Sequence, residues 1–115
     1  MSGKRRKRKE AKRQARAIVF AALGDETRLL LVSRLGAGEP ASIAQLTEGS
    51  SLTRQAVTKH LRVLQSAGVV HCRRQGRESL FTLDPEPLNA LHDYLDRVSR
   101  RWDESLARLK AFVED

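Results

Sequence analysis

Residues 53–77 bring together the side-chain types that read DNA bases and those that bind DNA phosphates. Arginine and glutamine form paired hydrogen bonds with guanine and adenine edges, threonine can touch the thymine methyl group, and lysine suits phosphates. A helix with one such cationic face, followed by a basic hairpin, can lie in the major groove with a β-ribbon beside it. We therefore predict a DNA-contact surface formed by Thr53, Arg54, Gln55, Thr58, Lys59, His60, Arg62, Arg73, Arg74 and Arg77.

Position along the helix divides these contacts into two roles. Residues near the N-terminus of a recognition helix usually reach the bases, so Arg54, Gln55 and Thr58 are expected to read sequence. Lys59 and Arg62 follow them and are expected to bind phosphates. The plainer alternative is that this is an ordinary solvated helix face.

Two reactive side chains in the same stretch allow more than one interpretation. His60 either donates to a phosphate or is a histidine satisfied within the protein at the margin of the helix. Cys72 is interpreted as a small apolar strand residue, with a thiol switch as the alternative. As the single cysteine of the chain, Cys72 excludes an internal disulfide and fits a reducing cytoplasm, which is the location we expect.

Capping residues and apolar spacing predict the helices of a helix-turn-helix. Ser42–Gln45 has the Ser-x-x-Gln form of a capping box, which predicts a short helix from Ser42 to about Glu48. Thr53 can cap the recognition helix, whose buried stripe at helical spacing is Val57, Leu61 and Leu64. Asp25 can cap an earlier helix, whose apolar face we expect to be Leu29, Leu30, Val32 and Leu35.

A hairpin should follow the recognition helix. Gly68 stands where the end of a helix needs the left-handed conformation. Val69–Arg74 and Glu78–Leu83 are expected to pair as strands around Gln75-Gly76, where glycine tolerates a positive φ. The expected fold class is therefore mainly α with a β-hairpin wing, a winged helix-turn-helix.

Charge is concentrated in two places in this chain of 115 residues. The net charge is +8, and residues 1–16 hold nine Lys or Arg and one acid, so the remainder is neutral. Within that neutral body, residues 53–78 carry six basic residues against one acid, which places positive charge on the predicted contact surface. We expect residues 1–13 to be a basic disordered tail and residues 14–115 to be the folded domain, with its first helix from about Arg13 to Leu23.

The basic tail is interpreted as an arm that follows DNA, since flexible cations add phosphate contacts without sequence information. A solubilising extension is one alternative, and in a eukaryote the run Lys4–Lys9 would suggest nuclear import. The chain has no run of membrane-spanning length and no signal peptide, so no membrane partner is expected.

The end of the chain predicts a homodimer. After Pro85 and Pro87, apolar residues follow an a/d heptad pattern that leaves more apolar surface than one small domain can bury, although packing within a single subunit is the alternative. Two recognition helices related by a two-fold axis would meet successive major grooves, which implies an inverted-repeat operator. We expect the first and last helices of two subunits to form the interface, through Ile18, Val19, Leu91, Leu95, Val98, Trp102 and Leu109.

Several of these motifs together resemble the winged-helix repressors of the ArsR/SmtB family. The similarity covers roughly residues 17–113, and two of the segments that carry it are Leu23–Arg28 and Ala56–Leu64. Three further segments look like the start, tip and end of the family's wing: Ala67–Val70, Gly76-Arg77 and Leu83–Pro85. The resemblance implies a homodimeric bacterial transcription factor, usually a repressor. Its site would be an inverted repeat in the operator of its own or a neighbouring operon.

The chain departs from the metal-sensing branches of that family. One branch carries a pair of cysteines on the helix before the recognition helix, where Ala41–Leu46 provides no thiolate or imidazole. Another binds zinc between C-terminal helices, but here a single imidazole, that of His92, stands among acids: Asp93, Asp96, Asp103 and Glu104. We therefore expect the branch without a metal-binding box, with no metal site and no cofactor, and the sequence does not identify a small-molecule effector.

The sequence predicts a sequence-specific DNA-binding transcriptional regulator and not an enzyme. It has no glycine-rich phosphate loop, no Cys/His cluster and no nucleophile in a recognisable elbow. The alternative function is a winged helix used for RNA binding, DNA architecture or protein docking, without sequence-specific readout of duplex DNA.

Overall fold

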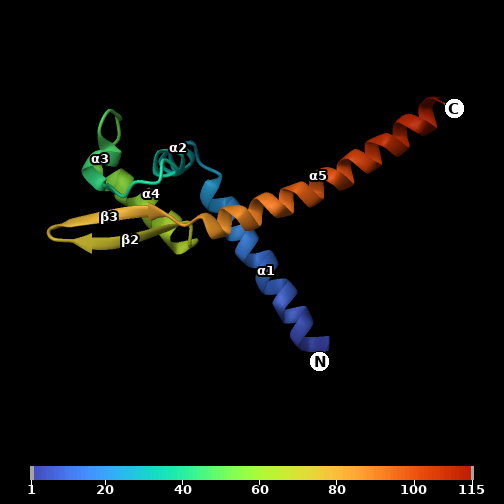
Figure 1. The fold of residues 1–115 in the computed structure, drawn as a ribbon, viewed down its shortest axis with the longest axis horizontal. Helices are drawn as coiled ribbons and strands as arrows, with labels where there is room; N and C mark the ends of the chain where they lie inside the picture. The colour runs from blue at the N-terminus through green and yellow to red at the C-terminus, as the bar shows by residue number, and fades with distance from the viewer. Residues whose placement is uncertain (1, 115) are drawn as a thin grey trace.

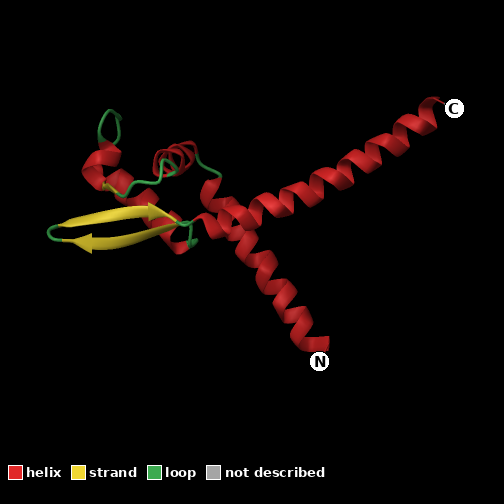
Figure 2. Cartoon of the chain, in the orientation of Figure 1, coloured by secondary structure: helices red, strands yellow, loops and turns green. Residues whose placement is uncertain are grey.

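Five helices and three strands form residues 2–114, the part of the chain that this computed structural model describes (Figures 1 and 2). In chain order the elements are α1 (Ser2–Leu23), α2 (Glu26–Leu35), β1 (Ala41–Ser42), α3 (Ile43–Thr47), α4 (Arg54–Ser66), β2 (Val70–Gln75), β3 (Glu78–Leu83) and α5 (Pro85–Glu114). The expected fold class is confirmed, since the chain is a mainly helical winged helix-turn-helix. Within this described part, no helix combines the length and the apolar character needed to cross a membrane.

Side-chain caps start helices α2, α3 and α4 at the expected residues. Asp25 accepts a hydrogen bond from the Arg28 amide at 3.0 Å, and Thr53 accepts one from the amide three residues further on at 3.1 Å. At Ser42 both halves of the capping box are present, because its hydroxyl accepts from the Gln45 amide while the Gln45 side chain accepts from the Ser42 amide. These bonds satisfy amides that the first turn of a helix leaves unpaired.

The wing is the hairpin of β2 and β3, joined by the turn Gly76-Arg77. Gly68 after α4 has φ 78° and Gly76 in the turn has φ 63°, positive angles that glycine adopts without steric cost. The strands lie within one residue of their expected bounds, with Gln75 paired opposite Glu78. The short strand β1, which was not predicted, pairs antiparallel with β3 and gives the strand order β1-β3-β2.

The core lies between the helices and the base of the wing. Its fully buried side chains include Val57, Leu61 and Leu64 on α4, as expected, and Val69 and Val70 at the start of the wing. The end of α4 is also joined to the wing by a backbone hydrogen bond from the Val69 amide to the Leu64 carbonyl oxygen, 3.0 Å long. Helix α4 and the wing are therefore held as one unit.

The buried face of α2 differs from the expected one. Leu31 and Leu35 are buried, with Val32 partly buried beside them. Leu29 and Leu30, which we expected on this face, are 52% and 48% exposed. The run 29–32 is apolar all round the helix, so spacing alone cannot indicate its inner side, and the packing of α2 against α4 decides it.

Helix α1 begins at Ser2, far earlier than the expected start near Arg13, so the disordered tail expected over residues 1–13 is instead helical where the structure describes it. Met1 lies outside the described residues. The segment is built from Lys, Arg, Ala, Gln and Glu, which are good helix formers. Extending a helix that is already packed at one end needs less free energy than nucleating a new helix. The high charge density of the segment was therefore a poor guide to whether it is disordered.

Helix α5 leaves the body of the domain and extends well beyond it (Figure 1). Asp84 Oδ1 accepts from the amide two residues further on at 3.0 Å, and a proline at the first helical position suits such a start. Near its beginning α5 packs against α1, where the Arg16 guanidinium lies 3.9 Å from the centre of the Tyr94 ring and Phe20 meets that ring edge-on. Residues 99–114 are all exposed within the single chain.

The revised inner face of α2 makes a stability prediction. Leu31→Ala should lower the free energy of unfolding by about 2 to 5 kcal/mol, because it leaves a cavity in the core. Leu30→Ala, the matched change on the neighbouring residue, should shift it by about 0.5 kcal/mol or less, as for an exposed site. Urea unfolding of both variants checks this, and equal losses would show that the face is wrongly assigned.

Candidate nucleic-acid interface

Four of the six predicted contact residues within α4 lie on the side of the helix that faces away from the core. At 3.6 residues per turn, Gln55, Thr58, Lys59 and Arg62 lie roughly opposite the buried stripe. Gln55, Lys59 and Arg62 are exposed, Thr58 is partly exposed, and Arg54 is exposed at the first residue of the helix. The structure thus gathers four of these side chains on one accessible side of α4, while Arg54, three residues before Val57, is exposed because it begins the helix.

Two threonine hydroxyls of this region already have partners within the chain. The Thr53 hydroxyl accepts the capping hydrogen bond that starts α4, and the Thr58 hydroxyl donates to the Arg54 carbonyl oxygen at 2.7 Å. Thr58 therefore keeps its methyl group available for a thymine, as expected, while Thr53 acts first as a helix cap.

The wing presents the other predicted cations. Arg73 and Arg74 follow one another on β2 and therefore point to opposite faces of the hairpin, while Arg77 lies in the turn. All three are exposed, and Val70 is the one buried residue of β2, so most of the hairpin projects away from the body (Figure 1). Alternating arginines on a projecting hairpin can meet phosphates on either side of it.

The base of the wing is held by a hydrogen bond between two side chains. His71 Nε2 lies 2.7 Å from Asp84 Oδ2, and the other oxygen of Asp84 caps α5. The hydrogen bond from His71, helped by the bond from the α5 amide, lowers the pKa of Asp84 below its usual 3.8. Asp84 therefore ties strand β2 to the start of α5.

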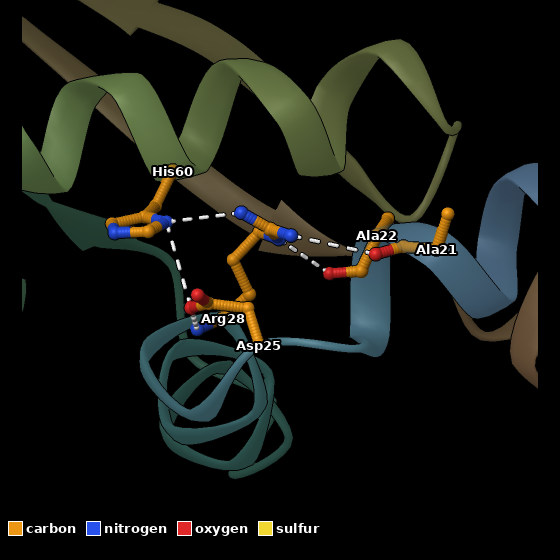
Figure 3. Close-up of polar contacts among 5 residues, drawn as sticks. All are labelled: Ala21, Ala22, Asp25, Arg28 and His60. Atoms are coloured by element: carbon orange, nitrogen blue, oxygen red, sulfur yellow. Dashed lines mark hydrogen bonds and ion pairs between the residues drawn. The ribbon is translucent and has the colours of Figure 1, made fainter.

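His60 faces inward, toward the junction of α1 and α2 (Figure 3). Its Nδ1 atom lies 3.3 Å from Nη1 of Arg28 and 3.7 Å from Oδ2 of Asp25. Because a guanidinium can only donate, Nδ1 accepts in this arrangement and the neutral ring carries its proton on Nε2. The geometry favours the interpretation of His60 as a histidine satisfied within the protein, since its Nδ1 is engaged there.

Arg28 links three helices, and sequence reasoning assigned it no role. Its Nε donates to the Ala22 carbonyl oxygen at 2.6 Å and its Nη2 to that of Ala21 at 3.4 Å, at the end of α1, while Nη1 reaches His60 on α4 (Figure 3). A cation is favoured at the C-terminal end of a helix, where carbonyl groups are unpaired. The contact with His60 spans 32 residues of sequence, so no local pattern could have revealed it.

Asp25 completes this network as a charged cap. The backbone hydrogen bond from the Arg28 amide lowers the pKa of Asp25 below its usual 3.8, and the nearby charge of the Arg28 guanidinium acts in the same direction. Asp25 thus remains a carboxylate at neutral pH. It holds the start of α2 beside the recognition helix.

The residues predicted for dimerisation divide into two groups. Val19 and Leu91 are 6% and 7% exposed and belong to the core of the single chain, which corrects their assignment as interface residues. Their helix positions face the neighbouring helices of the same subunit, and Val98 is partly buried. The other predicted residues are exposed: Ile18, Leu95, Trp102 and Leu109. Four further large apolar residues on the same two helices are also exposed: Phe20, Leu106, Phe112 and Val113.

Groups that could ligate a metal are dispersed. His92 Nδ1 lies 4.0 Å from a carboxylate oxygen of Asp93 and of Asp96, and all three side chains are mostly exposed. Over residues 2–114, no three His, Cys, Asp or Glu side chains gather closely enough to hold a metal ion. Cys72 is exposed on β2.

Comparison with known proteins identifies the family. A helix-turn-helix domain model matches residues 23–73. The HTH-type transcriptional regulator Rv2034 of Mycobacterium tuberculosis is 41% identical over 95 residues, which cover 83% of this chain and 85% of that protein. The solved structure of an ArsR-like transcriptional regulator from Rhodococcus sp. RHA1 is 35% identical, with a TM-score of 0.75, and the match covers 89% of this chain and 95% of that one. The chain belongs to the ArsR family of transcriptional regulators.

A third similar protein shares the fold of this ArsR-family chain. Mb0332 from Mycobacterium bovis, solved as a homodimeric winged helix-turn-helix DNA-binding domain, aligns with a TM-score of 0.64 over 88% of this chain and 90% of that one. At 24% identity the likeness concerns the fold alone. Membership of the ArsR family makes this chain a transcriptional regulator and not an enzyme.

The charge of Asp25 predicts a pH effect on the stability of this ArsR-family chain. Because the folded-state pKa lies below the usual 3.8, the carboxylate stabilises the fold above that pH, and the contribution is lost as pH falls through the folded-state pKa. Asp25→Asn retains a good cap but not the charge. Urea unfolding should show the wild type more stable at neutral pH and the two proteins converging in acid. A difference that does not vary with pH would contradict the role of the charge.

The position of Arg54 predicts that its substitution changes the base preference of DNA binding. On a duplex selected by the wild-type protein, Arg54→Ala should cost about 1 to 3 kcal/mol and relax the choice of base at one position in each half-site. Lys59→Ala is the matched control and should weaken binding to all sequences alike. Binding to a panel of single-base variants measures both effects, and a uniform loss for Arg54→Ala would make it a phosphate contact.

Proposed function

We propose that this ArsR-family regulator is a homodimeric repressor that recognises an inverted-repeat operator in duplex DNA. The observation that carries the proposal is that α4 has one apolar, buried side and one polar, exposed side. The apolar stripe of Val57, Leu61 and Leu64 is fully buried, while Gln55 and Arg62 are exposed on the other side. A helix held by its apolar side offers its polar side to the major groove, which is wide enough to admit it.

In this proposal the two ends of the surface have different tasks. Arg54, Gln55 and Thr58 read base edges, because they lie in the first turns of α4. Lys59 and Arg62 bind phosphates beside the groove. The wing arginines extend the phosphate contacts outward, since the hairpin projects from the same unit as α4: Arg73, Arg74 and Arg77.

The exposed apolar residues of α1 and α5 support a homodimer. Trp102, Leu109 and Phe112 are 65%, 60% and 82% exposed in one chain, on helical turns whose residues are all exposed. An open groove of about 610 Å³ between α1 and the start of α5 is lined in part by Ile18 and Pro87. A second copy that packs on these helices would cover both features and create the two-fold axis that an inverted repeat requires.

Repression follows from occupancy in this proposal. A dimer seated across two half-sites in a promoter would exclude the transcription machinery from the same DNA. We place the protein in the cytoplasm of a bacterial cell, where such an operator is accessible.

We also propose that the protein belongs to the branch of the family without a metal-binding box. Residues 41–46, which form β1 and the start of α3, carry no thiol or imidazole that could bind a soft metal ion. On α5, His92 and its acidic neighbours are mostly exposed to solvent. The inducing signal, if it is a ligand, would then be something other than a metal held at these two positions.

Selection of bound duplexes from a random DNA pool tests the proposed function. The full-length protein at near-physiological salt should enrich an inverted repeat whose half-sites lie about one helical turn apart. Binding without enrichment of any sequence would refute specific readout, and it would favour an RNA-binding, architectural or docking module.

A substitution of Trp102 tests the proposed dimer interface. Buried tryptophans often contribute about 2 kcal/mol or more to an interface, so Trp102→Ser should weaken the dimer on the order of 30-fold. Arg101→Ser, on the adjacent exposed position, is the matched control and should change the dimer constant little. Sedimentation equilibrium measures both, and equal dimer constants for Trp102→Ser and the wild type would exclude this surface.

A further inference from the structure

The N-terminal part of α1 is a helical segment in which most residues are cations. Residues 3–16 contain nine Lys or Arg and a single acid, Glu10. Every residue of this segment except Arg16 is exposed, and Arg16 is the one that packs on Tyr94. We call residues 3–16 the basic arm.

The body of the protein fixes the direction of the basic arm. The arm and the packed end of the same helix are continuous, and that end places Val19 and Ala22 in the core. A helix of this length extends about 20 Å, at 1.5 Å per residue. In Figure 1 the N-terminal half of α1 projects away from the other elements.

The charge of the basic arm is not neutralised within the chain. None of its cations forms an ion pair in the described part of the molecule. Like charges also repeat four residues apart, along Lys4, Arg8, Lys12 and Arg16, and such pairs repel one another on a helix. A bound polyanion would relieve this repulsion, so the arm as built favours an anionic partner.

We propose that the basic arm binds the phosphate backbone of duplex DNA regardless of base sequence, as a contact separate from those of α4 and the wing. Duplex DNA carries about one negative charge per 1.7 Å of its axis, so an arm about 20 Å long meets a comparable density of opposite charge.

The composition of the basic arm distinguishes DNA from other anionic surfaces. It has no aromatic residue on which the bases of a single strand could stack. Its only apolar side chains are Ala11 and Ala15, too little apolar surface for a helix that lies in a membrane interface. Cations alone suit a regular array of phosphates.

The test compares two variants of the full-length protein with the same change in net charge. In the arm variant Arg5, Arg8, Lys9 and Lys12 become Gln, a residue that maintains helix propensity. In the control variant the exposed α5 residues Arg100, Arg101, Arg108 and Lys110 become Gln. Circular dichroism and sedimentation confirm that helix content and assembly match the wild type before binding to a random-sequence duplex is measured across salt concentrations.

We expect the arm variant to bind the random duplex more weakly and with a shallower salt dependence. The slope of log affinity against log salt should fall by up to about 0.9 for each phosphate that an arm no longer neutralises. The control variant should retain a slope close to that of the wild type. An unchanged slope in the arm variant, or an equal change of slope in both variants, would overturn the proposal. It would also be overturned if the arm variant lost affinity only for single-stranded RNA of equal length.

This experiment separates the basic arm from the proposed function, because a random duplex contains no operator. If pool selection recovers no inverted repeat while the arm variant still flattens the salt slope, the arm inference stands and specific readout by α4 fails. If selection succeeds and the slope does not change, the arm inference is the one refuted.

Discussion

The burial of one stripe of α4 is the constraint on which the rest of the structure depends. Val57, Leu61 and Leu64 are completely removed from solvent, and this fixes the rotation of the helix about its axis. The polar residues Gln55, Lys59 and Arg62, on the other side of the helix, must then face outward whatever their own preferences. The wing follows from the same packing, because Val69 and Val70 are buried against the end of α4 and bring the arginines of the hairpin with them.

A network of polar side-chain contacts connects this recognition helix to the rest of the subunit. Arg28 bonds to carbonyl groups at the end of α1 and reaches His60 on α4, and Asp25 holds the start of α2 beside them. Helix α1 also packs against α5, the helix with the largest exposed apolar surface. In the proposed dimer along α1 and α5, these hydrogen bonds would be the polar contacts that join the interface helices to α4.

Features with a local cause could be predicted from the sequence, and features with a distant cause could not. The caps at Asp25, Ser42 and Thr53 each need a partner only three residues away, and all are confirmed. The inner face of α2 was wrong at Leu29 and Leu30, because a run that is apolar on all sides takes its orientation from tertiary packing. The Arg28–His60 contact and strand β1 depend on residues far along the chain, and they carry no local signal.

The most direct measurement of the central claim uses Cys72, the single cysteine, which is exposed on the wing. An iron chelate attached to Cys72 cleaves bound DNA close to wherever the wing lies. On a duplex chosen by pool selection, two α4 helices in successive major grooves predict two clusters of cleavage, placed symmetrically about the centre of an inverted repeat. A single cluster, or cleavage spread evenly along the duplex, would contradict the account of a two-fold dimer that reads DNA through α4 and the wing.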